Sequence, residues 1–98
     1  MTETEQKVAI ITGGLAAVTK SLAVEYASRG IRVNAVAPGI TQTPLQPPES
    51  YTPEALAGKL PPLGRVGQVS DIVDGILYLE SASYVTGEIL YIDGGRTA

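Results

Sequence analysis

The chain of 98 residues is long enough for one small domain, and 44% of its residues are hydrophobic against 17% charged, a composition typical of globular proteins. It contains no cysteine and no histidine, which excludes disulfides, thiolate nucleophiles, Ser-His-Asp hydrolysis and most zinc sites. The net charge of −3 with scattered basic residues argues against nucleic acid as a partner. No apolar run approaches the ~20 residues of a membrane span, so we expect no membrane partner and a cytoplasmic location.

The first half of the chain alternates between strand and helix patterns. Residues 7–12 (KVAIIT) are apolar on both faces, which is typical of a buried parallel strand. Residues 15–29 follow the period of a helix that ends at Gly30. Its predicted core-facing stripe is Leu15, Val18, Leu22 and Tyr26. Residues 31–37 (IRVNAVA) form a second predicted strand.

The second half begins with an irregular segment. All seven prolines lie between Pro38 and Pro62, so residues 38–67 are expected to form a long loop, and loops of this length are usually functional. Residues 53–59 are compatible with a short helix. A second main helix begins near 68–70, and its predicted core-facing stripe is Val69, Ile72, Val73, Ile76 and Leu77. Residues 88–92 (EILYI) form the third predicted strand.

This order of elements predicts one α/β domain over residues 1–98. Strands that alternate with helices favour a small parallel sheet, here of three strands in chain order with two main helices. Right-handed crossovers would place both helices on the same face of the sheet.

Three stretches resemble the C-terminal part of a short-chain dehydrogenase/reductase, a family of NAD(P)-dependent oxidoreductases with a Rossmann-like fold. They are AVTKSLAVEYASRGIRVNAVAPGITQTPL (17–45), PLGRVGQVSDIVDGILYLES (62–81) and SYVTGEILYIDGG (83–95). Residues 7–13 (KVAIITG) resemble the first strand of that family. The resemblance implies an internally truncated member, whether by deletion, by design or as an unusual gene product. It also implies that the last helix lies on the opposite face of the sheet from the first.

The resemblance places the family's nucleotide loop, TGxxxGxG, at the end of the first predicted strand. Thr12, Gly13 and Gly14 would belong to it, but Ala17 and Thr19 stand where the later glycines are needed. Those glycines let the backbone approach the pyrophosphate. We therefore expect NAD or NADP to bind weakly or not at all. The alternative is that the two glycines form only a strand-to-helix turn.

The turn after the second predicted strand is the best preserved candidate site. The resemblance implies that Pro38, Gly39, Ile40 and Thr43 face the nicotinamide, with the backbone near Ile40 and the Thr43 hydroxyl on its carboxamide. The alternative is a simple turn that ends the strand.

Two further segments carry expectations from the resemblance. Residues 45–63 resemble a substrate lid, with a surface loop as the alternative. Residues 93–95 (DGG) resemble a terminal turn that often lies at a subunit interface, with a plain turn as the alternative.

The family's catalytic pair is a tyrosine and a lysine four residues later, with a serine on the preceding strand. The residues four positions after the five tyrosines are Gly30, Ala55, Ala82, Glu88 and Gly95. No catalytic residue and no metal ligand is therefore assigned. We interpret the chain as a domain that is not catalytic on its own, either an assembly module or a weak nucleotide binder. The alternative is an NAD(P)-dependent oxidoreductase.

A sheet this small is expected to leave apolar strand residues partly uncovered: Val8, Ile10, Ile11, Ile89 and Ile92. Uncovered apolar surface favours self-association, so a homo-oligomer is expected. The resemblance implies contacts through the third predicted strand, the turn at 93–95 and the helix at 15–29.

Overall fold

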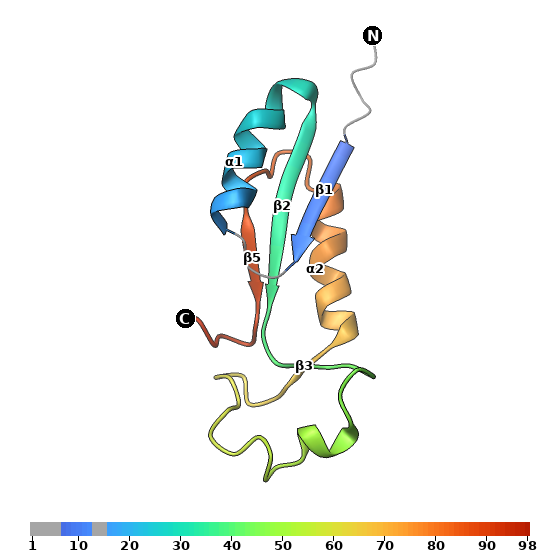
Figure 1. Cartoon of the computed structure of the whole chain (residues 1–98), viewed down its shortest axis with the longest axis vertical. Coiled ribbons are helices and arrows are strands. Elements are labelled where there is room, and N and C mark those ends of the chain that lie inside the picture. The colour runs from blue at the N-terminus through green and yellow to red at the C-terminus, as the bar shows by residue number, and fades with distance from the viewer. Residues whose placement is uncertain (1–6, 13–15) are drawn as a thin grey trace.

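The computed structural model describes residues 7–12 and 16–98. The body of the molecule is a parallel sheet of β1 (Lys7–Thr12), β2 (Ile31–Pro38) and β5 (Ile89–Ile92), hydrogen-bonded in the order β1-β2-β5. All three strands run in one direction and end at the lower edge of the sheet (Figure 1). The predicted strand order and α/β class are confirmed.

The central strand, β2, is buried on both faces. Its residues 32–36 are all buried, because a strand flanks it on each side and a helix packs on each face. The five residues expected to be partly uncovered, on β1 and β5, are indeed half-buried. The core is therefore narrow and centred on β2.

The two main helices lie on opposite faces of the sheet (Figure 1). One is α1 (Ala16–Tyr26), which continues into the 3-10 turn η1 (Ala27–Arg29), and the other is α2 (Val69–Ser81). The β1–α1–β2 and β2–α2–β5 connections advance in the same direction across the sheet but pass over opposite faces. They therefore have opposite handedness, and one of them departs from the usual right-handed rule. The placement that the resemblance implied is correct, and the one expected from the general rule is wrong.

Helix α1 ends as predicted but buries a different stripe. Gly30 takes a φ of 72° and donates its N–H to the carbonyl of Ala27, a left-handed stop that glycine adopts without strain. The buried residues are Thr19 and Ala23, whereas Val18 is 47% exposed. These small side chains let the helix lie close to β2. The periodicity of the apolar residues does not indicate this close approach. Leu15, from the predicted stripe, lies outside the described residues.

Helix α2 is also rotated relative to the prediction. Leu79 is fully buried, whereas three of the five predicted core residues are about half exposed: Val69, Val73 and Leu77. Gly75 accounts for the rotation, since a Cβ at this position would overlap the Cδ1 of Ile92 and touch the Cδ2 of Leu90 at 3.4 Å. The glycine lets α2 approach β5 closely, and the larger apolar residues are turned aside.

The loop below the sheet contains short elements that sequence patterns did not indicate. A two-stranded parallel ladder joins β3 (Thr41–Gln42) to β4 (Gly67–Gln68), and a 3-10 turn, η2 (Pro48–Tyr51), lies between them. The suggested helix over 53–59 is absent, and this described segment forms turns. Thr52 is extended, as expected for a residue before proline, which ends the preceding turn.

This loop makes the molecule elongated. Its principal extents are 57 × 23 × 22 Å and its radius of gyration is 16.0 Å, whereas a compact domain of this length has a radius of about 13 Å. None of the described helices is long and apolar enough to cross a membrane.

Candidate functional site at the strand ends

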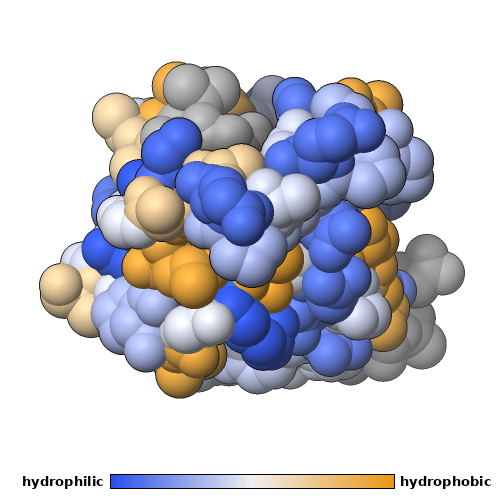
Figure 2. Space-filling view, turned by 90° about the horizontal axis from the view of Figure 1, so that it is seen from below, coloured by the Kyte–Doolittle hydropathy of each residue, from blue (hydrophilic) through white to orange (hydrophobic). Residues whose placement is uncertain are grey.

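The carboxyl ends of the three parallel strands meet at the edge where open α/β sheets bind ligands. Pro38 ends β2 and lies beside Ile92 of β5, and Thr12, the last residue of β1, lies beside Val36. The predicted nucleotide-loop residues Gly13 and Gly14 lie outside the described residues. Seen from this end of the molecule, apolar surface is exposed between hydrophilic side chains (Figure 2).

Gly39 is placed by a close crossing of two backbone segments. Its N–H donates to the carbonyl of Ile92 at 3.1 Å, which extends the β2–β5 pairing past Pro38. A Cβ at Gly39 would lie 2.8 Å from the Cβ of Asp93 and 2.9 Å from its Cα. Only glycine allows this approach without a backbone shift. The backbone crossing therefore requires glycine at position 39 whether or not a ligand binds.

Three of the candidate nicotinamide contacts share one cleft, which we call the strand-end cleft. It has a volume of about 370 Å³, and its lining includes Pro38, Gly39, Ile40, Tyr91, Asp93, Arg96 and Thr97. The volume lies at the small end of the range for ligand sites. The cleft can accept one ring, such as a nicotinamide, rather than a whole dinucleotide.

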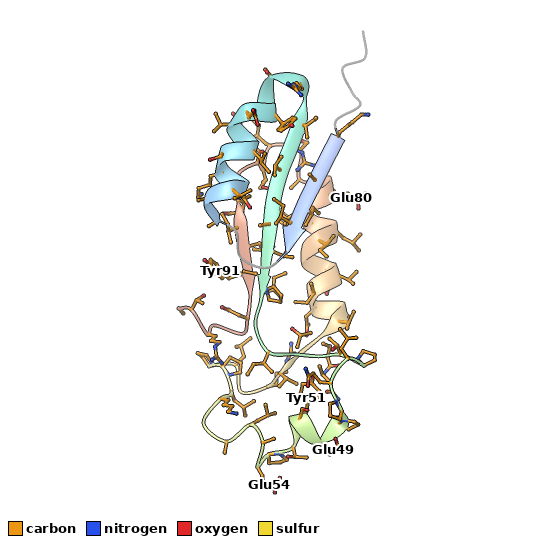
Figure 3. The ribbon with its side chains drawn as sticks, viewed as in Figure 1. Glu49, Tyr51, Glu54, Glu80 and Tyr91 are labelled. Carbon is orange, nitrogen blue, oxygen red and sulfur yellow. The ribbon has the colours of Figure 1, made fainter. Side chains whose placement is uncertain are left out.

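Thr43 does not share that cleft. It lines a separate hollow with Tyr51 and several prolines. The Thr43 N–H donates to the Tyr51 hydroxyl at 3.3 Å, and that hydroxyl donates to the Thr41 carbonyl at 3.2 Å. The Thr43 hydroxyl oxygen accepts from the N–H of Leu45 at 3.3 Å. Figure 3 shows Tyr51 at the top of the lower loop, while Glu49 and Glu54 lie further out.

A second cleft, of about 320 Å³, lies between the loop that precedes α2 and the turn at 93–95, and Ile40 and Asp93 line both clefts. The Leu63 N–H donates to the Gly94 carbonyl at 3.0 Å, and Gly94 packs against Pro61. The turn at 93–95 therefore packs against the chain's own loop. Its role at a subunit interface, which the resemblance implies, stays a prediction.

The charges around the two clefts are already engaged. Arg65 donates to the Asp71 carboxylate at 3.0 and 3.4 Å, and with the backbone N–H of Gln68 it lowers the pKa of Asp71. The Thr97 hydroxyl, together with nearby backbone N–H groups, lowers the pKa of Asp93. Arg96 donates to the Lys59 carbonyl at 3.2 Å. Asp71 and Asp93 bring negative charge to the clefts, and the guanidinium groups of Arg65 and Arg96 already donate to protein oxygens. This arrangement does not favour binding of a pyrophosphate.

The tyrosines and lysines of the described residues do not form the tyrosine–lysine pair of the family, and none was assigned from the sequence. Lys20, on α1, donates to the Gly87 carbonyl at 3.2 Å, near the amino end of β5 and away from the clefts. Tyr78, Tyr84 and Tyr91 are exposed. The part of the chain that the structure describes holds no cluster of three or more potential metal ligands.

Two features of the site were missed by sequence reasoning. Tyr51, in the middle of the proline-rich segment, bonds back to Thr41 and Thr43 near its start, and no local pattern indicates this contact. The bond between the Gln68 N–H and Asp71, at 2.7 Å, closes the first turn of α2. The spacing of a polar residue and an acid three positions later could have indicated this cap.

Comparison with known proteins gives concordant results. A family model described as Enoyl-(Acyl carrier protein) reductase matches residues 2–97. The 3beta-hydroxysteroid dehydrogenase 1 of Eggerthella lenta is 49% identical over 88 residues, which cover 86% of this chain and 34% of that protein. The chain therefore spans about a third of the length of the curated relatives it matches.

Solved structures of other proteins also resemble this chain. A 3-oxoacyl-[acyl-carrier protein] reductase from Brucella melitensis with bound NAD has a TM-score of 0.70 at 38% identity, covering 86% of this chain and 30% of the other. ElxO with NADP bound has a TM-score of 0.75 at 31% identity, covering 92% and 45%. With a family model matched along nearly its whole length, this chain belongs to the short-chain dehydrogenase/reductase family.

Proposed function

We propose that this chain binds the nicotinamide end of NAD or NADP weakly in the strand-end cleft and does not transfer hydride on its own. The observation that carries the proposal is in the sequence: none of the five tyrosines is followed by lysine at the fourth position. Without that pair, the family's general acid is missing, and proton transfer of this kind typically contributes 10²–10⁴-fold to a rate.

The relatives support the cofactor class. Two of the similar structures hold NADP and NAD, and both of those chains are more than twice as long as the part matched here. In this chain, Pro38, Gly39 and Ile40 lie together in a cleft of suitable size for one ring. This geometry favours the nicotinamide end as the part of the cofactor that binds.

The charges support weak binding. A dinucleotide brings two phosphate charges, and Asp93 lines the cleft as a carboxylate with a lowered pKa. Arg65 is already paired with the Asp71 carboxylate, and Arg96 donates to the Lys59 carbonyl, so part of the donor capacity of both guanidinium groups is used and the charge of Arg65 is offset. The phosphate half of the cofactor therefore contributes little affinity.

A ligand series tests which half of the cofactor binds. Amide chemical shifts of the full chain would be followed in titrations with NAD⁺, nicotinamide mononucleotide and ADP-ribose. NAD⁺ and the mononucleotide are expected to bind with similar millimolar affinity and to shift Gly39 and Ile40, while ADP-ribose leaves them unmoved. Tighter binding of ADP-ribose than of the mononucleotide would contradict the assignment.

An absorbance assay tests the absence of catalysis. NADH and NADPH would be mixed with simple ketones and with the chain, and no oxidation above background is expected. Turnover that is lost in Tyr51→Phe, the tyrosine that faces a hollow, but kept in Tyr84→Phe, the fully exposed control, would overturn the proposal.

We also propose that the chain self-associates. Its accessible surface is 6603 Å², whereas a compact folded chain of its mass exposes about 5,300 Å². The loop that extends below the sheet accounts for part of this excess. The support for self-association comes from the half-buried apolar residues on both outer strands of the described sheet, since uncovered apolar surface favours association.

A further inference from the structure

The outer edge of β1 carries backbone groups that face away from the sheet. The Lys7 N–H donates toward β2, to the Gly30 carbonyl at 3.3 Å. Because successive residues of a strand direct their backbone groups to opposite edges, the N–H and C=O groups of Val8, Ile10 and Thr12 point outward. Within the described sheet, β1 is an edge strand, so these groups have no strand to pair with.

This edge lacks the features that usually prevent pairing. Residues 8–12 (VAIIT) contain no charge, no proline and no glycine, whereas exposed edges are commonly protected by lysine, proline or a bulge. Lys7 is the one charged residue of β1, and it lies at the start of the strand. The edge is therefore competent to bind another strand.

An apolar helix flank lies beside the same edge. Gly75 of α2 faces β5, so the residues on the far side of the helix turn away from β5 and toward the side of β1. These are Val69, Val73 and Leu77, each 43–54% exposed. In Figure 1, α2 lies behind β1, and the two elements are in contact. The open edge and the exposed flank thus form one surface.

We propose that a second copy of this chain covers this surface, with the two β1 strands paired antiparallel about a two-fold axis. If Ile10 lies opposite Ile10 of the second copy, then Val8 lies opposite Thr12, and the three outward residues exchange about six backbone hydrogen bonds. This register keeps Lys7 away from its symmetry mate. It also places the two α2 helices on one face of a continuous sheet, with their apolar flanks turned toward the joint.

The second copy is favoured by self-complementarity and by area. A two-fold interface needs the same patch on both partners, and an unprotected strand edge beside an apolar flank meets this requirement. The half-exposed side chains of Val69, Val73 and Leu77 add apolar area beside the strand edge that a second copy would bury. This inference rests on the proposed self-association but assigns it to β1 rather than to the third strand, the turn at 93–95 or α1.

Light scattering over a concentration series tests the proposal, using the full chain and two variants. Ile10→Pro removes the outward N–H at the two-fold axis and leaves the β1–β2 hydrogen bonds, which come from the alternate residues. We expect it to retain the circular dichroism spectrum of the parent chain. We expect its dimerisation affinity to fall at least about tenfold. A folded Ile10→Pro chain that dimerises like the parent would overturn the β1 interface while self-association stands. A monomeric parent chain would overturn both.

A single-cysteine pair gives a second readout, because the chain has no cysteine of its own. Ile10→Cys places the two thiols opposite each other, at a Cα separation of about 5.5 Å, within disulfide range. The control is Val24→Cys, on α1 and 81% exposed. Under mild oxidation, Ile10→Cys is expected to form a covalent dimer far faster than the control. Equal rates, or a faster control, would overturn the proposal even if Ile10→Pro fails to fold.

Discussion

Replacing Arg32 by methionine removes a buried guanidinium that joins the carboxyl end of α2 to β2. Arg32 is 5% exposed, and its Nη1 donates to the carbonyls of Leu79 at 2.8 Å and Val85 at 3.1 Å, while Nη2 donates to that of Glu80 at 2.7 Å. Two of these carbonyls belong to the last turn of α2, where helices carry unpaired acceptors and a partial negative charge. One side chain therefore satisfies acceptors that the helix itself cannot.

The size of the effect follows from the number and type of these bonds. A hydrogen bond to a charged group contributes about 1.5–3 kcal/mol, but the burial of the guanidinium opposes this gain. We expect Arg32→Met to lower the free energy of unfolding by about 2–4 kcal/mol. Because small domains have about 5–10 kcal/mol in total, the variant is expected to unfold at much lower urea concentration.

Urea unfolding followed by circular dichroism measures this difference. Arg29→Met is the matched control, because Arg29 is exposed and its guanidinium lies over the Tyr26 ring, 4.9 Å from the centroid. Arg32→Lys keeps the charge but not the planar fork, so an intermediate loss is expected. If Arg32→Met and Arg29→Met unfold within about 0.5 kcal/mol of each other, the claim that this clamp holds α2 to the sheet is refuted.

Gly39→Ala is expected to destabilise the chain by about 1–3 kcal/mol, since its Cβ would lie 2.8 Å from that of Asp93; a urea midpoint equal to the parent's would contradict this. Leu79→Ala should cost about 2–5 kcal/mol because the residue is fully buried, whereas Leu77→Ala, 54% exposed, should cost much less, and thermal melts compare them. The Asp93 carboxylate, whose pKa is lowered chiefly by the Thr97 hydroxyl, contributes stability above its unfolded pKa of about 3.9. That contribution disappears as pH falls through the lower folded pKa. Asp93→Asn should therefore unfold at lower urea than the parent at pH 7, and the difference should vanish in strong acid; a difference that persists there would contradict the assignment.

The sequence by itself determined the three strands of the sheet, the two main helices and their order. The apolar run at residues 7–12 predicts a parallel strand, and it forms one, although it lies at the edge of the sheet and is only partly covered. Gly30 ends the first helix, with the left-handed φ of 72° that glycine takes without strain. The family also follows from the sequence, since its motifs are contiguous stretches that need no tertiary contact to be recognised.

The candidate site could be predicted only in part. Pro38, Gly39 and Ile40 are adjacent in sequence and lie together in one cleft. Thr43 is three residues further on, yet it lies in another hollow because Tyr51 holds its N–H. A contact between residues that no periodic pattern relates cannot be predicted from local spacing.

The faces of the helices were decided by the tertiary structure. Apolar periodicity identifies a stripe, but the face that packs is the one that comes closest to the sheet. On α1, Thr19 and Ala23 are small enough to lie against β2, and on α2, Gly75 allows contact with β5. Larger apolar residues on the same helices are left half exposed as a result. Steric fit between surfaces distant in the chain, rather than hydrophobicity alone, therefore set the orientation of both helices.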